Sequence, residues 1–191
     1  MTRPSSLLSL QPPFAGAAAK PVTWAIGDLI EAAGGGVFDI APEPTEANRR
    51  RIDYLFDNDL YDLPDAERPD CHRNGTSYTS VYGRMPPDRP AQTITTGIGS
   101  PGQGRFIHPT RRRLITPHEA ARIQGFPDWF SFAVKGREPS RKELAKWIGD
   151  AVPPFLGFVA TSFALDALLG KRARDRQIAE CGLPLEPTGP R

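Results

Sequence analysis

Arginine and threonine side chains in the middle of the chain are the residues best suited to chemistry with an anionic partner. From Arg68 to Arg113 the sequence has eight arginines, no lysine and two acidic residues. A guanidinium binds phosphate through two parallel hydrogen bonds, so such a segment is typical of a phosphate-contacting surface. Thr93 and Thr95 occupy alternate positions of a β-prone stretch and would share one face there. Ordinary solvated charge, and strand propensity alone, are the competing interpretations.

Nucleophilic and metal-binding residues are sparse by comparison. Cys71 and Cys181 lie far apart, and Cys71-His72 has no second cysteine or histidine at zinc-ligand spacing. The sequence therefore predicts neither a disulfide framework nor a metal site. Gly97–Gly102 reads G-x-G-x-x-G, but Pro101 lies inside it and no helix is expected after it. Because a dinucleotide site needs that helix, we interpret the segment as a loop.

The composition is that of a globular protein with many turns. The 191 residues suffice for a domain with its own core, and 21 prolines and 18 glycines indicate a sizeable irregular fraction. There is no signal-peptide pattern, and the two cysteines suit a reducing compartment, so we expect a cytoplasmic protein. The apolar stretch Val152–Leu169 contains Asp166 and is short for a membrane span, so no membrane partner is expected.

Helix and strand signals define five elements. A helix is predicted from Thr23, as its N-cap, to Glu31, and a second over 45–56. Residues 91–96 are β-prone and predict a short strand. Thr116-Pro-His-Glu119 is a capping box that begins a short helix, and Pro153-Pro154 introduces a last helix over 155–169.

Three blocks of sequence carry a family resemblance. Arg113–Asp128 reads RLITPHEAARIQGFPD, and Ile148–Pro154 reads IGDAVPP. Upstream, Tyr82–Thr96 contains the element Pro-Ala-Gln-Thr-Ile-Thr. In this order they resemble the end of the target-recognition region and the last two conserved motifs of the DNA cytosine-5 methyltransferases. The resemblance extends over roughly residues 21–169.

The resemblance implies a fold and a division of the chain. The expected class is α/β (mixed): an irregular target-recognition segment plus the C-terminal elements of a methyltransferase domain, incomplete on its own. The expected segments are a loose leader, a target-recognition-like region, the C-terminal part of the methyltransferase domain and a basic, flexible tail, at 1–20, 21–110, 111–170 and 171–191.

The resemblance also implies a reaction: transfer of a methyl group from S-adenosylmethionine to cytosine in double-stranded DNA, as in restriction–modification. In the family the final motif helps form the cofactor pocket. The implied cofactor-binding residues are Gly149, Asp150, Ala151 and Val152. The implied DNA-binding residues are Arg84, Arg89, Thr93, Thr95, Arg105, Arg113 and Arg122. At the position of Asp150 the family usually has Asn, and an ionised Asp accepts hydrogen bonds without donating them.

The chemical residues of that family are absent from this sequence. The family's nucleophile is the thiolate of a Pro-Cys pair, and its carboxylate belongs to Glu-Asn-Val; neither pair occurs here. We therefore expect no catalytic residue in this chain, inactivity of the chain alone, and cofactor binding only together with a missing N-terminal portion, which a separate chain would supply. The alternatives are a catalytically dead remnant that binds DNA, and an interaction domain whose arginines bind an acidic protein.

Overall fold

The chain divides into two compact units. The computed structural model describes residues 18–31, 36–73 and 80–169. Ala19–Ala151 forms the larger unit, and residues 1–18 and 152–191 form the other. The larger unit thus includes residues from both sides of the expected boundary at residue 110.

The described residues fold into α-helices and short 3-10 helices. The α-helices are α1 (Val22–Ile26), α2 (Glu46–Asp57), α3 (Pro117–Ile123), α4 (Arg141–Asp150) and α5 (Pro154–Leu169). The 3-10 helices are η2 (Gly27–Glu31), η3 (Asp65–Glu67), η4 (Asp70–His72) and η5 (Pro101–Gln103). In the described ranges, β-pairing is limited to isolated bridges, so these residues do not confirm the expected mixed α/β class.

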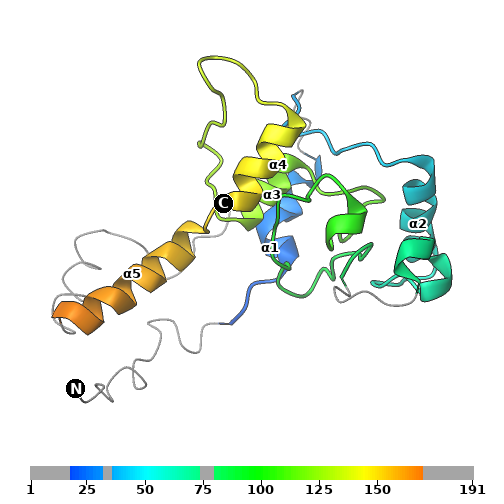
Figure 1. The fold of residues 1–191 in the computed structure, drawn as a ribbon, viewed down its shortest axis with the longest axis horizontal. Coiled ribbons are helices and arrows are strands. Elements are labelled where there is room, and N and C mark those ends of the chain that lie inside the picture. The colour runs from blue at the N-terminus through cyan, green and yellow to red at the C-terminus, as the bar shows by residue number, and fades with distance from the viewer. Residues whose placement is uncertain (1–17, 32–35, 74–79, 170–191) are drawn as a thin grey trace. The chain divides into compact units, whose positions relative to one another are not determined.

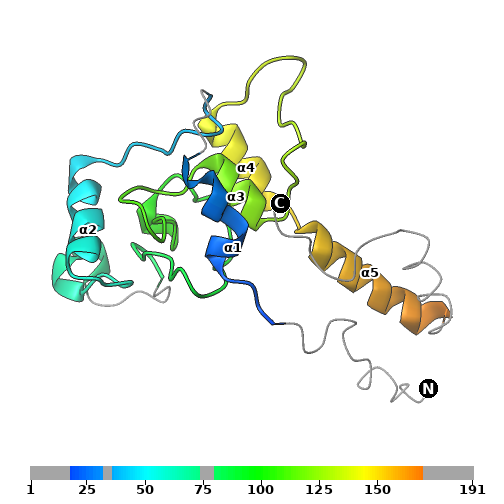
Figure 2. The same cartoon turned by 180° about the vertical axis from the view of Figure 1, so that it is seen from behind.

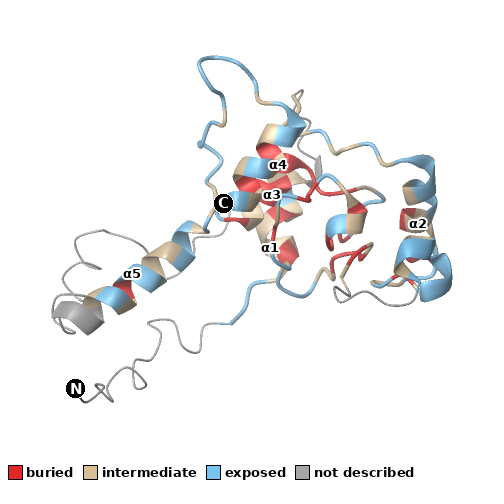
Figure 3. Cartoon of the chain, viewed as in Figure 1, coloured by how far each residue is buried: buried red, intermediate tan, exposed pale blue. Residues whose placement is uncertain are grey.

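The core of the larger unit lies around α3, which packs against both α1 and α4 (Figures 1 and 2). Buried residues gather on these helices and on the neighbouring loops (Figure 3). Three loop segments run side by side next to the helices: Ile107 bridges to Arg84 on one side and to Leu114 on the other. Removal of these apolar side chains from water is the main stabilising contribution. The largest fully buried apolar side chains of this core include Ile26, Phe106, Ile107, Leu114, Leu144 and Ile148.

Side chains cap the starts of α2, α3 and α4. The predicted capping box of α3 is confirmed: the Thr116 hydroxyl accepts from the Glu119 N–H, and the Glu119 carboxylate accepts from the Thr116 N–H. Thr45 caps α2 by accepting from the Asn48 N–H. A second capping box, Ser140 with Glu143, begins α4, a helix that the sequence analysis did not predict.

Two local predictions were wrong. Thr23 is not an N-cap: Pro21 occupies that position of α1, and the Thr23 hydroxyl donates to the Pro87 carbonyl over 2.8 Å. Residues 91–96 form no strand, because no described segment pairs with them. Their alternation persists, since Ile94 is buried and Thr93 is exposed.

Helix α5 confirms the predicted last helix and is apolar on all sides. By length and composition alone, Arg141–Leu165 would pass as one membrane-spanning segment. The structure interrupts it at Ala151–Pro153, where α4 has ended and α5 has not begun. Neither α4 nor α5 alone reaches the roughly 20 residues that a span needs.

Gly149 allows α4 to approach another backbone segment closely. A Cβ atom at residue 149 would lie 2.2 Å from the Thr96 nitrogen and 2.4 Å from the Thr95 carbonyl carbon. Such separations are far inside van der Waals contact, and backbone atoms cannot rotate away. The glycine of the last sequence block therefore serves the contact between α4 and the Thr-Ile-Thr-Thr segment.

We expect Gly149→Ala to destabilise the chain. Alanine favours a helix by about 1 kcal/mol over glycine, but overpacking against fixed atoms costs about 1–3 kcal/mol and here meets backbone, so the net effect is unfavourable. Urea unfolding followed by circular dichroism measures the change in the free energy of unfolding. Gly27→Ala is the matched control, because its Cβ would meet nothing within 4 Å. Equal stability of the two variants would contradict the close contact.

Candidate nucleic-acid interface and cofactor loop

The Glu119 carboxylate is a buried charge that is surrounded by hydrogen-bond donors. Its side chain is 1% exposed and accepts two hydrogen bonds of 2.7 Å from Arg113, one on each oxygen. It also accepts a hydrogen bond of 2.8 Å from the Thr116 N–H, and His108 Nε2 lies 3.4 Å from its Oε1 atom. Burial by itself raises the pKa of Glu119, but the bonds from Arg113 and His108 outweigh it and lower the pKa to about 2.

His108 completes this cluster from the neighbouring loop. The ring is fully buried, and its Nδ1 accepts from the N–H groups of Thr110 and Arg111 at 3.1 and 3.0 Å. Because Nδ1 accepts, the ring proton of the neutral form is on Nε2, the atom that faces Glu119. His108 thus ties the loop before Arg113 to the start of α3.

Arg122 forms a second charged cluster at the end of α3. It binds Asp128 through two hydrogen bonds of 2.8 and 2.6 Å and reaches Asp28 at 2.7 Å. These contacts, led by the Asp128 hydrogen bonds, raise the pKa of Arg122, and those from Arg122 lower that of Asp128. Asp128 also lies 3.3 Å from His118, whose other ring nitrogen is 2.7 Å from Asp39.

Gln124 connects the two conserved blocks directly. Its buried amide donates to the Ile148 carbonyl at 2.8 Å and to the Ala151 carbonyl at 3.2 Å. These carbonyls belong to the last turn of α4 and the residue after it, where helical partners are missing. Gln124, in the block Arg113–Asp128, therefore donates hydrogen bonds to carbonyl groups of the block Ile148–Pro154.

Arg84 and Arg105 lie in the interior of the larger unit, with 9% and 8% of their surfaces exposed. Arg84 donates to the Pro109 carbonyl and lies 4.1 Å above the Phe56 ring. Arg105 donates to the Arg84 carbonyl and pairs with Asp62. Both guanidinium groups therefore use hydrogen-bond donors to connect loops within the unit. Their contact with DNA stays a prediction.

The remaining predicted DNA-binding residues differ in accessibility. Arg89 and Thr93 are exposed, and no side-chain partner of Arg89 lies among the described residues. The Thr95 hydroxyl is half-buried and accepts from the Gly97 N–H at 3.3 Å. Arg113 and Arg122 are already paired with carboxylates. Without rearrangement, Arg89 and Thr93 are the members most available to a phosphate.

The predicted cofactor-binding residues also have distinct surroundings. Gly149 contacts backbone, and the Ala151 carbonyl accepts from Gln124. The Asp150 carboxylate is half-exposed and pairs with Lys146 one turn earlier. Val152, which belongs to the other unit, is 67% exposed. Asp150 and Val152 are therefore both accessible, and cofactor binding by these four residues stays a prediction.

Cys71 is a free cysteine in the described structure. Cys71 is exposed in the short helix η4, whose first residue is Asp70. No group of three or more histidine, cysteine or acidic side chains in the described ranges is arranged to hold a metal ion. Cys181 lies outside the described residues.

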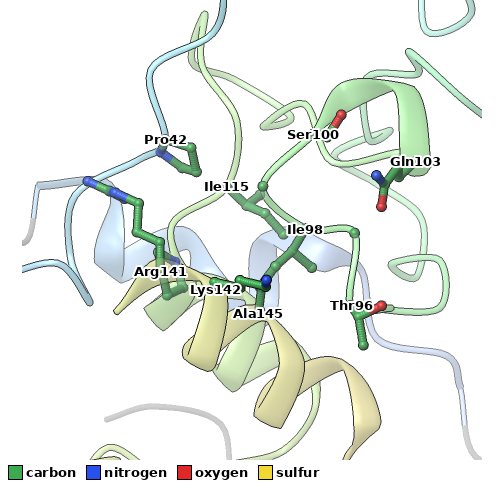
Figure 4. A pocket seen from close by; sticks show the side chains of 12 residues that line it. Pro42, Thr96, Ile98, Ser100, Gln103, Ile115, Arg141, Lys142 and Ala145 are labelled. Carbon is green, nitrogen blue, oxygen red and sulfur yellow. The ribbon is translucent and has the colours of Figure 1, made fainter. Parts of the chain in front are cut away.

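A pocket of about 300 Å³ lies between the loop Thr96–Gln103 and the first turn of α4 (Figure 4). Arg141 and Lys142 line it from the helix, and Ser100 lines it from the loop. The sequence analysis did not identify these residues. The Ser-x-x-Glu signal at 140–143 would have revealed the helix, but not the loop opposite it.

Comparison with known proteins identifies the family. The family described as C-5 cytosine-specific DNA methylase matches residues 40–162. The chain is 54% identical over 141 residues to type II methyltransferase M1.BsuMI of Bacillus subtilis (strain 168), covering 73% of this chain and 32% of that protein. It is 40% identical over 134 residues to type II methylase M.HgiDII of Herpetosiphon aurantiacus, covering 69% and 38%.

The chain belongs to the C-5 cytosine-specific DNA methylases, as its three sequence blocks predicted. The likeness extends to DNA (cytosine-5)-methyltransferase 1 of Gallus gallus, 32% identical over 114 residues, covering 59% of this chain and 7% of that protein. The chain spans about a third of the length of the two bacterial relatives.

The pH dependence of stability tests the Glu119 cluster. Because the folded-state pKa is lowered from 4.5 to about 2, the ionised carboxylate contributes about 3 kcal/mol above about pH 4.5, and this is lost as the pH falls toward 2. We expect Glu119→Gln to be less stable than wild type at pH 7, with a difference that shrinks over that interval in urea unfolding.

Glu143→Gln is the matched control, because Glu143 belongs to the other capping box. Hydrogen bonds from Arg137 and then from Ser140 lower the pKa of Glu143 to about 2, but the group faces solvent, which screens the interaction. We expect a smaller loss for Glu143→Gln. Equal losses, or a Glu119→Gln loss that does not change with pH, would refute the assignment.

Proposed function

We propose that the chain is the DNA-recognition and closing portion of a DNA (cytosine-5-)-methyltransferase, an enzyme that transfers a methyl group from S-adenosylmethionine to cytosine in DNA. The observation that carries the proposal is the interlocking of the three conserved blocks. Gln124 joins the first motif to the second, and Gly149 joins the second to Thr95–Thr96. A recognition segment held rigidly to the cofactor loop is what such an enzyme needs to place a base relative to a methyl donor.

The nucleophile of the reaction lies outside these residues in this proposal. Attack on C6 of an extruded cytosine needs an activated thiolate, and a carboxylate must stabilise the attacked ring. Here Cys71 follows Asp70 and Cys181 follows Glu180, so the Pro-Cys pair is missing. The chain would then be inactive alone, and an N-terminal family portion on a separate chain would supply both groups.

S-adenosylmethionine supplies the methyl group when it is bound. The roles we assign to this chain's residues are limited to holding it. Asp150 would accept a hydrogen bond from an ammonium or hydroxyl group, while Gly149 and Ala151 fix the path of the loop. Val152 would offer an apolar contact. Because Asp150 pairs with Lys146, binding through Asp150 must compete with that pair.

Double-stranded DNA is the proposed macromolecular partner. We assign the direct backbone contacts to Arg89, Thr93 and Thr95, which lie on or near the accessible side of the recognition segment. We assign Arg84 and Arg105 the positioning of loops, because their donors are already used inside the unit. A restriction–modification role in the cytoplasm fits a partner of this kind.

Exposed apolar side chains on the larger unit support a protein partner. Trp129 is 83% exposed, and Phe130 and Val134 are 41% and 44% exposed in the loop between α3 and α4. Large apolar groups gathered in one loop are typical of a surface that another polypeptide covers. We propose that the N-terminal portion covers this loop.

A catalytically dead DNA-binding remnant is the second candidate. It is favoured by the core of the larger unit, which is formed by residues of this chain alone. The two candidates make the same DNA contacts and differ only in whether a complementary portion restores methyl transfer.

Methyl transfer in a reconstituted mixture tests the proposal. Labelled S-adenosylmethionine and mixed-sequence genomic DNA would be incubated with this chain, with an N-terminal family portion carrying Pro-Cys and Glu-Asn-Val, and with both. We expect label in DNA only with both, and a change in Trp129 fluorescence on mixing. Cys71→Ser in this chain is the control and should leave the restored activity unchanged.

DNA binding without restored methyl transfer would support the remnant instead. Methyl transfer by this chain alone would contradict the location of the nucleophile. Loss of restored activity in the Cys71→Ser variant would assign Cys71 a chemical role that the proposal denies.

A further inference from the structure

The pocket beside α4 combines cationic and hydroxyl side chains without any acidic residue. Its volume is about 300 Å³, and none of its lining residues is aspartate or glutamate. Arg141 and Lys142 stand on the α4 side, and Thr96, Ser100 and Gln103 stand on the loop side (Figure 4). All five side chains can donate hydrogen bonds.

The two cations of this pocket have no carboxylate partner in the described structure. Arginines elsewhere are largely neutralised, for example Arg105 by Asp62 and Arg113 by Glu119. Within the described ranges the Arg141 side chain makes one hydrogen bond, from Nη1 to the Ile40 carbonyl at 2.5 Å, which leaves its other donors available. The exposed Lys142 ammonium has no hydrogen bond or ion pair within the described ranges.

A second pocket of about 380 Å³ has the opposite character. Asp39, Asp128 and Glu138 line it, and no arginine or lysine does. An anion is therefore repelled from this second pocket and attracted to the one beside α4. Of these two pockets in the larger unit, the one beside α4 is suited to anions and the other is not.

We propose that the pocket beside α4 binds a phosphodiester group of the DNA backbone, with Lys142 and Arg141 as the charged contacts and Thr96 and Ser100 as hydroxyl donors. The inference rests on the proposed DNA-binding function and adds a site to it. DNA is favoured over a free phosphate compound because the pocket continues the Thr93–Thr96 segment, where exposed threonine side chains extend the polar surface.

The salt dependence of DNA binding measures this contact. Each phosphate neutralised by a cation contributes about 0.9 to the slope of log affinity against log salt. A fluorescein-labelled duplex would be titrated with the full chain over a range of salt concentrations. We expect the double variant Arg141→Gln/Lys142→Gln to reduce the slope by about one, because both cations meet the same phosphodiester group, and Lys142→Gln alone to reduce it by part of that amount.

Lys135→Gln is the charge-matched control. Lys135 is exposed, has no carboxylate partner in the described part of the chain, and lines neither pocket. We expect its slope to equal that of wild type. Circular dichroism and urea unfolding of each variant separate lost binding from lost folding, because α4 contributes Leu144 and Ile148 to the core.

A parallel titration with sodium pyrophosphate distinguishes the sources of phosphate. We expect pyrophosphate to compete with the duplex only at concentrations where simple ionic strength does so too. Tight pyrophosphate binding by wild type, lost in Lys142→Gln, together with no duplex binding, would overturn DNA as the ligand and the proposed function with it.

A steep slope for wild type that Lys142→Gln and the double variant leave unchanged would overturn the pocket as a contact. The proposed DNA-binding function would stand in that case, with its contacts at Arg89 and Thr93 instead. An equal fall of the slope in Lys135→Gln would also overturn the pocket, because any exposed cation would then have the same effect.

Discussion

Burial of the Glu119 carboxylate is the constraint on which the rest of the larger unit depends. An ionised group with 1% exposure is tolerated only when its oxygens are satisfied, and here hydrogen bonds from Arg113 and the Thr116 N–H satisfy them, with His108 close by. These partners come from the loop before α3 and from the start of α3 itself. The carboxylate therefore fixes where the helix begins and which way its other residues point.

The orientation of α3 determines how the conserved blocks meet. From this short helix and the turn that follows, Arg122 extends to Asp28 and Asp128, and Gln124 extends to the end of α4. The end of α4 in turn carries Gly149 against the Thr95–Thr96 backbone. The Thr95–Thr96 segment and the end of α4 are thus directly connected, and a substitution in either is expected to disturb the other.

Local sequence signals predicted the elements whose causes are local. The capping box at Thr116, the helix predicted over 45–56 and the apolar run of α5 depend on residues a few positions apart, and the structure confirms these elements. The Thr23 cap failed because Pro87, remote in sequence, accepts its hydroxyl. The strand over 91–96 failed because strands need a partner, which β-propensity alone does not supply.

The sequence composition indicated a candidate phosphate-binding segment, but it did not indicate which of its arginines pair with carboxylates inside the fold. The arginine-rich segment looked uniformly suited to phosphate, yet Arg84 and Arg105 are used inside the fold and Arg89 is not. Which arginine meets a carboxylate depends on tertiary contacts as distant in sequence as Arg105 and Asp62. Lys142 could not be predicted for the same reason, because its pocket forms only when the Thr96–Gln103 loop lies opposite α4.

The central claim is that this chain places a base for a nucleophile that it does not contain, and covalent trapping tests that claim most directly. In DNA whose cytosines carry fluorine at C5, a cysteine adduct at C6 persists, because the C5 proton needed for its release is absent. The reconstituted mixture would be digested and the DNA-linked peptide identified by mass spectrometry. The account predicts linkage to the Pro-Cys cysteine of the added portion and none to this chain. Linkage to Cys71 or Cys181 would contradict it.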